Sequence, residues 1–361
     1  MTSALVLLNL GTPGSANVKD VRAYLHEFLS DPRVLDINPV VRFLLLHCVI
    51  LRKRPAESAA AYRKIWTERG SPLLFHGLDL AEKVRQETRG GMIVELAMRY
   101  QSPSIRNVLT GLRERGVDEL ILFPLFPQYS SASWGSGVEK FFDEAGLLWD
   151  EPSIRVAPPY YDHPAFIGAF CDVARPILDE LQPDRVLMSF HGVPQRHVRT
   201  VFPGRPERDL LGTDGAGGDH CLQSRDCCAE ICPANRNCYS AHCYATARAL
   251  AAGLELGPEG WEVSFQSRLG RKPWLTPYTD FRIEELPAEG VEKVAVFCPA
   301  FTADCLETIE EIGIRADESF REAGGKELRL IPSLNSENSW AQAISRILAD
   351  TVGFEGAGAV G

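Results

Sequence analysis

The chain lacks the features of several large protein classes. It carries 38 Lys and Arg against 48 Asp and Glu, a net charge of -10, and its longest basic run is Arg52-Lys53-Arg54. Nucleic-acid binding needs a concentrated basic surface, so we expect no nucleic-acid partner. No apolar stretch reaches the ~20 residues that a membrane-spanning helix needs. The apolar run near the start has no basic residues before it and no small-residue cleavage site, so it predicts a buried strand rather than a secretory signal.

A phosphate-binding fingerprint is also missing. Gly11-Thr12-Pro13-Gly14 follows an apolar run but lacks the G-x-G-x-x-G spacing, and Pro13 has no backbone N–H to donate. We therefore expect no nucleotide cofactor.

Short apolar runs alternate with longer helical patterns, which favours parallel strands joined by crossover helices. Eight runs are nearly continuous in Val, Ile, Leu and Phe, as in strands covered on both faces. They are Ala4–Leu10, Met92–Met98, Glu119–Phe126, Ile154–Ala157, Arg185–Phe190, Glu262–Phe265, Lys293–Cys298 and Leu328–Ile331. Four precede residue 160 and four follow it, so the predicted fold class is α/β, with two similar units facing each other across a cleft. Ligands of such sheets bind at the carboxyl ends of the strands.

Two segments at predicted strand ends carry residues suited to metal or proton chemistry. His191 ends the fifth strand, and a neutral imidazole can bind a metal or accept a proton near pH 7. After the seventh strand a helix is expected to begin at Thr302 or Asp304. Glu307 and Glu311 lie four residues apart on one face of that helix. A structural histidine and a solvated acidic first turn explain the same residues, so both interpretations stay open at this point.

Several motifs occur together in a fixed order. In chain order these motifs are LLNLGTPG, AYRKIWTERGSPL, AMRYQSPS, LFPQYSSASWGSG, SFHGVP, FQSRLGRKPWLTPYTD and TADCLETIEEI. With these motifs the chain resembles the ferrochelatases from Leu7 to about Ser339. The resemblance implies two Rossmann-like (chelatase-type) domains, each a parallel sheet flanked by helices, around a porphyrin cleft. It also implies an enzyme, a metal-chelating lyase that inserts Fe²⁺ into protoporphyrin IX, giving protohaem and two protons in the last step of haem biosynthesis.

The resemblance assigns roles to individual residues. His191 and Glu307 match the pair that faces the macrocycle, and they divide iron ligation and proton acceptance between them in a way that stays open. Glu311 is a further metal ligand, but Arg315, one turn later, interrupts the acidic row. The porphyrin-pocket positions are Leu10, Arg99, Tyr100, Tyr129, Ser130, Ser133 and Asp304, and Arg63 and Lys64 are the expected partners of the porphyrin propionates.

Residues 36–54 match the family's hydrophobic lip at the mouth of the cleft. The apolar run from Val40 to Leu51 is followed at once by the basic residues 52–54, a composition that suits the surface of an anionic membrane. We expect a cytoplasmic protein, peripheral on the inner face of the membrane. The alternative is an ordinary buried helix with a basic last turn.

Six of the ten cysteines fall between Cys221 and Cys243. Without a secretory signal we expect reduced thiols, so this density predicts a metal site, for which Zn²⁺ and a [2Fe–2S] cluster are both chemically adequate. The insert is similar to one that carries [2Fe–2S] in some ferrochelatases, which favours the cluster. Four ligands are expected: Cys238 and Cys243 are the first choices, Cys221, Cys227 and Cys228 compete for the other two places, and Cys232 is the weakest choice. The cysteines elsewhere, such as Cys48, are expected to be buried.

The predicted domains are residues 1–158, with the lip; 159–335, with the cysteine insert 219–243; and a C-terminal helix and tail at 336–361. Two other functions remain. A ferrochelatase acting on coproporphyrin III would need more cationic donors and no membrane lip. A non-catalytic iron–sulfur protein would only bind the tetrapyrrole. The sequence says nothing about the oligomeric state.

Overall fold

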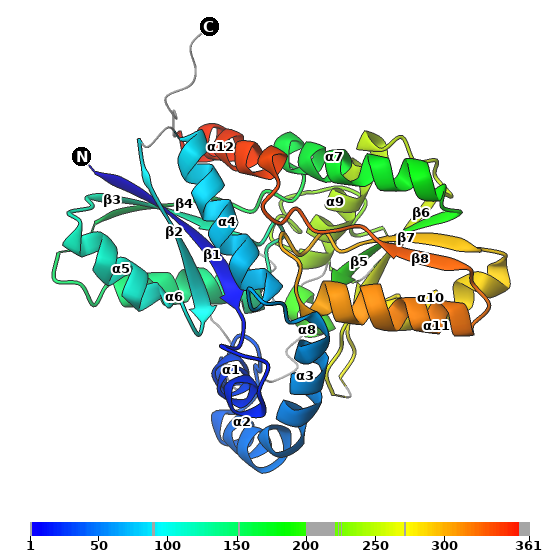
Figure 1. Cartoon of the computed structure of the whole chain (residues 1–361), viewed down its shortest axis with the longest axis horizontal. Helices are drawn as coiled ribbons and strands as arrows, with labels where there is room; N and C mark the ends of the chain where they lie inside the picture. The colour runs from blue at the N-terminus through cyan, green and yellow to red at the C-terminus, as the bar shows by residue number, and fades with distance from the viewer. Residues whose placement is uncertain are drawn as a thin grey trace, which may run out of the picture.

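The eight predicted strands all form, in two four-stranded parallel sheets (Figure 1). The structure, a computed structural model, describes residues 2–88, 91–150, 152–199, 221–222, 224, 226–270 and 272–353. The first sheet has the order β2-β1-β3-β4, with β1 Ser3–Gly11, β2 Ile93–Tyr100, β3 Glu119–Pro124 and β4 Ser153–Val156. The second has the order β6-β5-β7-β8, with β5 Arg185–His191, β6 Trp261–Gln266, β7 Lys293–Phe297 and β8 Glu327–Leu330. The predicted α/β class is confirmed.

Strand β1 shows why the strands are apolar on both faces. Leu5 and Leu7 point into a core that also contains Met188 and Phe190 of β5, so this core spans both sheets. Ala4, Val6 and Leu8 point the other way, onto α5 (Ile105–Glu114) and α6 (Ser136–Ala145). Since helices cover both faces, neither face can be polar.

Three helices cover one side of the two sheets: two run along the top of Figure 1, and the third runs down from them beside β1. They are α4 (Pro72–Glu87), α7 (Pro164–Leu181) and α12 (Asn338–Val352). Helix α12 packs on both of the others, and the fully buried Trp340 contacts Phe123 and Tyr160. The C-terminal helix therefore returns to the first half of the chain. The predicted tail beyond it, 354–361, lies outside the described residues.

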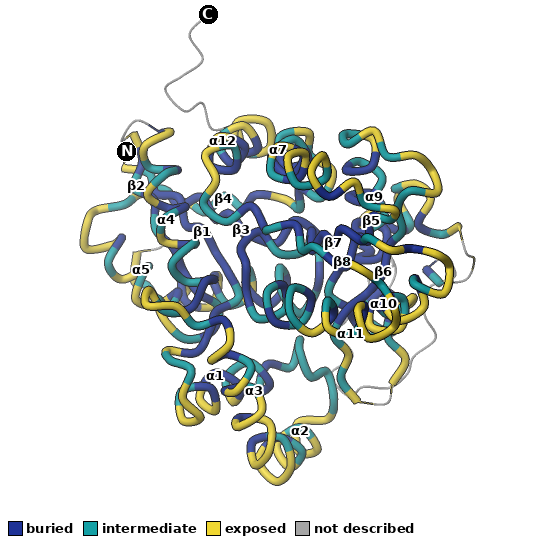
Figure 2. The backbone as a smooth tube through the Cα atoms, turned by 45° about the vertical axis from the view of Figure 1, so that its right-hand side comes forward, coloured by how far each residue is buried: buried dark blue, intermediate teal, exposed yellow. Residues whose placement is uncertain are grey.

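A helical lobe projects from the first half (Figure 1). It consists of α1 (Val18–Ser30), α2 (Pro39–Leu45), a short π-helix η1 (Leu46–Ile50) and α3 (Leu51–Ile65). The predicted lip includes α2, which has no buried residue and is largely exposed in Figure 2. Val40, Val41, Phe43, Leu44 and Val49 are each more than half exposed. The alternative of a buried helix is therefore wrong. No helix within the described ranges has the length and apolarity to span a bilayer.

The helix after β7 differs from the prediction. It is a π-helix, η4 (Leu306–Ala316), and its N-cap is Cys305 rather than Thr302 or Asp304. The Cys305 sulfur accepts the Thr308 N–H, and the Thr308 hydroxyl accepts the Cys305 N–H at 3.0 Å, a reciprocal capping box. A second expectation also fails, because Cys48 is exposed in η1.

Remaining helices surround the second sheet. They are α8 (Gln195–Arg199), α9 (Tyr239–Gly253), α10 (Thr279–Glu285), the 3₁₀ turn η3 (Leu286–Glu289) and α11 (Asp317–Glu322). Of these, α8 and α9 determine the surroundings of His191.

Candidate active site

His191 is the last residue of β5, where the second sheet ends toward the lobe. Its Nδ1 lies 2.6 Å from the carbonyl oxygen of Gly192. Because a carbonyl oxygen only accepts, Nδ1 carries the proton, and Nε2 presents its lone pair. The imidazole is half-buried, and the ring of Phe301 stands edge-on to it at a centroid distance of 6.2 Å. The neutral tautomer thus offers one nitrogen to a metal ion or a proton.

Gly192 fixes the turn that holds this imidazole. Its N–H donates to the Gln266 carbonyl at 2.6 Å. A Cβ at this position would lie 2.8 Å from the carbonyl oxygen of Ser267 and 3.0 Å from that of Gln266. Backbone cannot give way as a side chain does, so only glycine fits.

Glu307 is joined to the same strand ends through Gln266. The Gln266 amide donates to the Glu307 main-chain carbonyl at 2.8 Å and accepts from the Ser189 hydroxyl at 2.9 Å. Gln266 is also the register partner of His191. The two residues predicted to act on the substrate therefore flank one buried carboxamide.

The half-buried Glu307 also affects groups of the helical lobe. Burial raises the pKa of Tyr24 and the pKa of Tyr62 well above the ordinary value of a tyrosine, and the negative charge of Glu307 adds to both increases. Burial, followed by the charge of Glu307, likewise raises the pKa of the Cys305 thiol. Glu307 thus faces α1 and α3 across the junction between the two halves.

Glu311, predicted as a further ligand, already has protein donors. It accepts the Ser267 N–H at 3.1 Å and the Ser267 hydroxyl at 2.5 Å, and Arg315 approaches to 3.8 Å. The neighbouring Glu310, which sequence reasoning did not select, is buried and pairs with Lys64 at 3.0 Å. Lys64, expected at a propionate, is thus engaged in a contact between α3 and η4.

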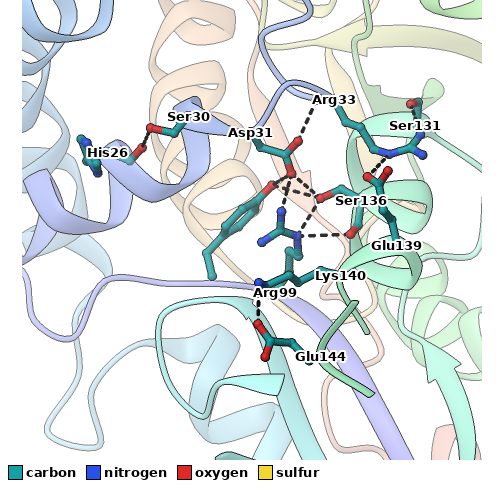
Figure 3. A network of polar contacts seen from close by, with 11 residues as sticks. His26, Ser30, Asp31, Arg33, Arg99, Ser131, Ser136, Glu139, Lys140 and Glu144 are labelled. Atoms are coloured by element: carbon teal, nitrogen blue, oxygen red, sulfur yellow. Dashed lines mark hydrogen bonds and ion pairs between the residues drawn. The ribbon is translucent and has the colours of Figure 1, made fainter. Parts of the chain in front are cut away.

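The predicted pocket residues Arg99 and Tyr100 converge on a carboxylate that sequence reasoning missed. Asp31 accepts from Arg99 at 2.7 Å, from the Tyr100 hydroxyl at 2.8 Å and from the Ser136 hydroxyl at 2.5 Å (Figure 3). Burial alone would raise the pKa of Asp31, but hydrogen bonds from Ser136, the Arg33 N–H and Tyr100, with the charge of Arg99, outweigh it and lower the pKa. This network ties the end of α1 to β2 and α6.

The predicted pocket loop around Tyr129 is attached to α9. The Tyr129 N–H donates to Nδ1 of His242 at 3.1 Å, and Nε2 of His242 lies 2.7 Å from the Arg236 carbonyl oxygen. Burial lowers the pKa of His242 to about 4, so the ring is neutral with its proton on Nε2. Ser130 is the N-cap of the π-helix η2 (Ser131–Gly135) and accepts the Ala132 N–H at 3.3 Å, and Ser133 is half-buried within that helix.

The other predicted pocket positions are dispersed around the junction. Leu10 is half-buried and packs with Leu306 of η4 on the lobe's core. Asp304 is buried and accepts from the Thr308 hydroxyl at 2.9 Å and the Asn335 amide at 2.7 Å, so it organises the turn before η4. Arg63 is exposed on α3.

The cysteine insert lies directly beside the strand that carries His191. Tyr239, which follows Cys238, donates its hydroxyl proton to the His191 carbonyl oxygen at 2.8 Å. The ten cysteines are free, so no disulfide is present. Interaction with Cys221 and Cys228, together with burial, raises the pKa of the Cys238 thiol, and the sulfurs of Cys227 and Cys228 are 3.7 Å apart. Hydrogen bonding by Cys238 lowers the pKa of Cys228 to about 6.

Cys243 and Cys232 are the two other cysteines of the insert. Cys243 lies on α9, where burial raises the pKa of its thiol. Cys232 is half-buried. No group of three or more His, Cys, Asp or Glu in the described part of the chain has an arrangement that could hold a metal ion.

Two cavities bear on where a substrate could bind. One of about 550 Å³ lies where β5 and β6 begin, lined by Asp184, Val186 and Gly260, at the opposite end of the strands from His191. A second, of only about 10 Å³, lies between Tyr129, Val193 and Tyr239, beside His191. The smaller cavity adjoins the strand end that carries His191, and we give this place at the carboxyl ends of the strands more weight than the volume of the larger cavity.

Comparison with known proteins decides the family. The ferrochelatase family model matches residues 2–352. The chain belongs to the ferrochelatase family. Ferrochelatase from Pseudomonas fluorescens (strain Pf-5) is 45% identical over 346 residues, covering 95% of this chain and 96% of that protein. Ferrochelatase from Legionella pneumophila (strain Paris) is 40% identical over 352 residues, covering 98% and 100%.

Solved structures with a similar fold include SirB from Bacillus subtilis, with a TM-score of 0.49 and 11% identity over 98% of each chain. Membership of the ferrochelatase family confirms the prediction of an enzyme, a metal-chelating lyase of haem biosynthesis. The substrates of this family are a porphyrin and ferrous iron.

Proposed function

We propose that the chain inserts Fe²⁺ into protoporphyrin IX in a cleft between the helical lobe and the carboxyl ends of the second sheet. The observation that carries this proposal is the pairing of His191 and Glu307 about Gln266, with the His191 tautomer that leaves Nε2 unprotonated. Of the predicted pocket residues, Tyr129 and Ser130 border the cavity beside His191.

The chemistry requires an acceptor for two protons. Fe²⁺ exchanges its water ligands for four pyrrole nitrogens, and the two pyrrole N–H protons leave as the iron–nitrogen bonds form. A neutral imidazole and a carboxylate can share proton acceptance and transient ligation of the incoming ion. No electron is transferred, so the balance is Fe²⁺ and porphyrin in, protohaem and two protons out.

Anaerobic Fe²⁺ insertion tests this proposal, with protoporphyrin IX and coproporphyrin III assayed side by side. We expect faster turnover of protoporphyrin. His191→Ala should lower the rate roughly 100- to 10,000-fold while leaving porphyrin affinity nearly unchanged. Preference for coproporphyrin would favour the alternative substrate, and binding of porphyrin without turnover of either would favour a non-catalytic tetrapyrrole-binding protein. An unaffected rate in His191→Ala would show that His191 does not act in the reaction.

We propose that the insert holds a [2Fe–2S] cluster through Cys221, Cys227, Cys228 and Cys238, with Cys243 as the alternative fourth ligand. Support comes from the 3.7 Å separation of the Cys227 and Cys228 sulfurs and from the effect of Cys221 and Cys228 on the pKa of Cys238. Fe–S clusters take four thiolates. Because the thiols contact one another without a preformed metal geometry, loading requires their side chains to rearrange.

Visible absorption with iron and sulfide analysis of anaerobically purified protein tests the cluster. Cys238→Ser should abolish the thiolate-to-iron bands, whereas the matched Cys232→Ser should retain them. A colourless, zinc-containing protein would contradict the proposal. If Cys227→Ser kept the bands and Cys243→Ser lost them, Cys243 rather than Cys227 would be the fourth ligand.

We propose that the lip docks on the inner face of the cytoplasmic membrane. Its exposed apolar side chains on α2 and η1 lie next to the exposed Arg52, Lys53 and Arg54, which suits an anionic lipid surface. In flotation with vesicles of phosphatidylglycerol and phosphatidylcholine, V40S/F43S should lose binding. The control is L147S/W149S, since Leu147 and Trp149 are exposed apolar residues far from the lip in sequence. Equal flotation of both variants would exclude docking through the lip.

We propose the division into residues 1–158 and 159–335, with 336–361 as a C-terminal helix and tail, as the domain organisation. The support is that β1–β4 and β5–β8 form separate sheets with the same kind of strand order.

A further inference from the structure

An ionic contact joins the lip to the helix that follows His191. Asp36 lies at the start of the lip, and its carboxylate pairs with the guanidinium of Arg196 through Nη2. The second carboxylate oxygen lies 3.2 Å from Nε2 of His197. Arg196 and His197 belong to α8, which Figure 1 places beside the lobe. The lip thus contacts the second half of the molecule through an ion pair next to the active site.

The guanidinium of Arg196 has unused donor capacity. Its Nε and Nη1 are buried and have no hydrogen-bond acceptor among the described residues. A guanidinium presents a planar fork that suits two carboxylate oxygens at once. Asp36 uses only one arm of this fork, because its other oxygen faces His197. A half-buried cation with two unsatisfied donors is the arrangement expected of a site for an anionic oxygen ligand.

Helix α8 also borders the space that the substrate must enter. His197 and Val193 line the cavity of about 10 Å³ together with Tyr129 and Tyr239. Sites for ligands of drug size enclose roughly 300–1,000 Å³, so a macrocycle cannot enter until this region opens. Asp36 on the lip and Arg196 on α8 lie on opposite sides of the contact that must separate.

We propose that Arg196 binds a propionate carboxylate of the porphyrin, and that Asp36 occupies the same guanidinium until the porphyrin arrives. When the propionate replaces Asp36, Arg196 stays paired with a carboxylate and the lip is released from α8. This assignment rests on the porphyrin cleft proposed above and makes Arg196 a specificity-determining residue. Lys64, expected at a propionate from the sequence, is in an ion pair with Glu310.

Substitutions of Arg196 and Asp36 are expected to change the Kd for protoporphyrin IX in opposite directions. Arg196→Gln removes the binding group, so the Kd for protoporphyrin IX should rise about tenfold. Asp36→Asn removes the competing charge, so the Kd should fall several-fold. A purely structural ion pair would make both variants bind more weakly. Fluorescence titration with metal-free protoporphyrin IX measures the Kd of the full-length wild type, of Arg196→Gln and of Asp36→Asn.

Protoporphyrin IX dimethyl ester supplies the second comparison, because it has the same ring without carboxylates. Its affinity should be the same for the wild type and Arg196→Gln. Arg199→Gln is the matched control, an exposed arginine on the same helix, and should bind both porphyrins like the wild type. Arg196→Lys keeps the charge without the fork and should bind protoporphyrin between the wild type and Arg196→Gln, which guards against a folding defect.

Three results would overturn the assignment. Equal weakening of protoporphyrin binding in Asp36→Asn and Arg196→Gln would show a structural pair. Equal loss of acid and ester affinity in Arg196→Gln would show that the side chain does not bind a carboxylate. A folded wild-type protein that binds neither porphyrin would instead overturn the proposed porphyrin cleft, and this assignment with it.

Discussion

The side-chain amide of Gln266 donates a 2.8 Å hydrogen bond to the main-chain carbonyl of Glu307. Gln266 is the neighbour of His191 in the second sheet, and its own oxygen accepts from Ser189. One buried carboxamide therefore sets the distance between the strand end that carries the imidazole and the π-helix that carries the carboxylate. The arrangement depends on both polar ends of this side chain, which an apolar residue of the same size lacks.

Gln266→Leu should lower kcat about tenfold and cost about 1–3 kcal/mol of unfolding free energy, because the Glu307 carbonyl loses a hydrogen bond and, among the described residues, the buried Ser189 hydroxyl keeps only its bond to Thr279. Porphyrin affinity should change little. Steady-state rates and urea denaturation measure these effects. Gln195→Leu is the control, since the Gln195 amide donates to the Trp274 carbonyl at 3.2 Å and does not contact Glu307 or Ser189 in the described part of the chain. Equal rates for the two variants would exclude a positioning role for Gln266.

Gly192→Ala tests how closely the turn after His191 is constrained. The added methyl group would meet the carbonyl oxygens of Ser267 and Gln266, so the backbone and the adjacent imidazole must shift. A displacement of about 1 Å lowers a rate on the order of 100-fold. The control is Gly111→Ala on α5, where no atom lies within 4 Å, and which should keep full activity. Wild-type turnover by Gly192→Ala would mean that the imidazole tolerates movement.

Asp31→Asn tests the network drawn in Figure 3. The substitution leaves the largely buried Arg99 without its counter-ion, which should cost about 3–5 kcal/mol at pH 7. The pKa of Asp31 is lowered in the folded protein, so its stabilisation is present above the unfolded value of about 3.9 and is lost as the pH falls through the folded value. Urea denaturation at pH 7 and near pH 3 should therefore show the difference between variant and wild type shrinking.

Asp150→Asn is the control for this comparison, because Asp150 pairs with Arg113 at an exposed position. It should change stability by less than about 1 kcal/mol at either pH. A similar small effect of Asp31→Asn would show that the buried network contributes little.

The strands and the two residues about Gln266 could be predicted from the sequence, whereas the side chains that hold them could not. Apolar runs and strand-end motifs are local signals, so β5 and the position of His191 at its end could be predicted. Asp31 meets Arg99 across 68 residues and His242 meets Tyr129 across 113, and no spacing in the sequence encodes such a pairing. The cap at Cys305 was missed for another reason. Cysteine is an uncommon N-cap, and the more usual capping residues nearby are engaged elsewhere.

His242→Gln tests the link between the cysteine-bearing helix and the pocket loop. Burial lowers the pKa of His242 to about 4, below its ordinary 6.5, so the unfolded chain takes up a proton that the folded protein excludes. Stability from this group is complete above about pH 6.5 and is lost as the pH falls toward 4, a change of about 3 kcal/mol. A glutamine can accept from Tyr129 and donate to Arg236 without titrating, so the variant should lose less stability over this interval. Urea denaturation between pH 7 and 4 measures it, with the exposed His26→Gln as control. If His242→Gln followed the wild-type pH profile, protonation of His242 would not be what weakens the attachment of the Tyr129 loop in acid.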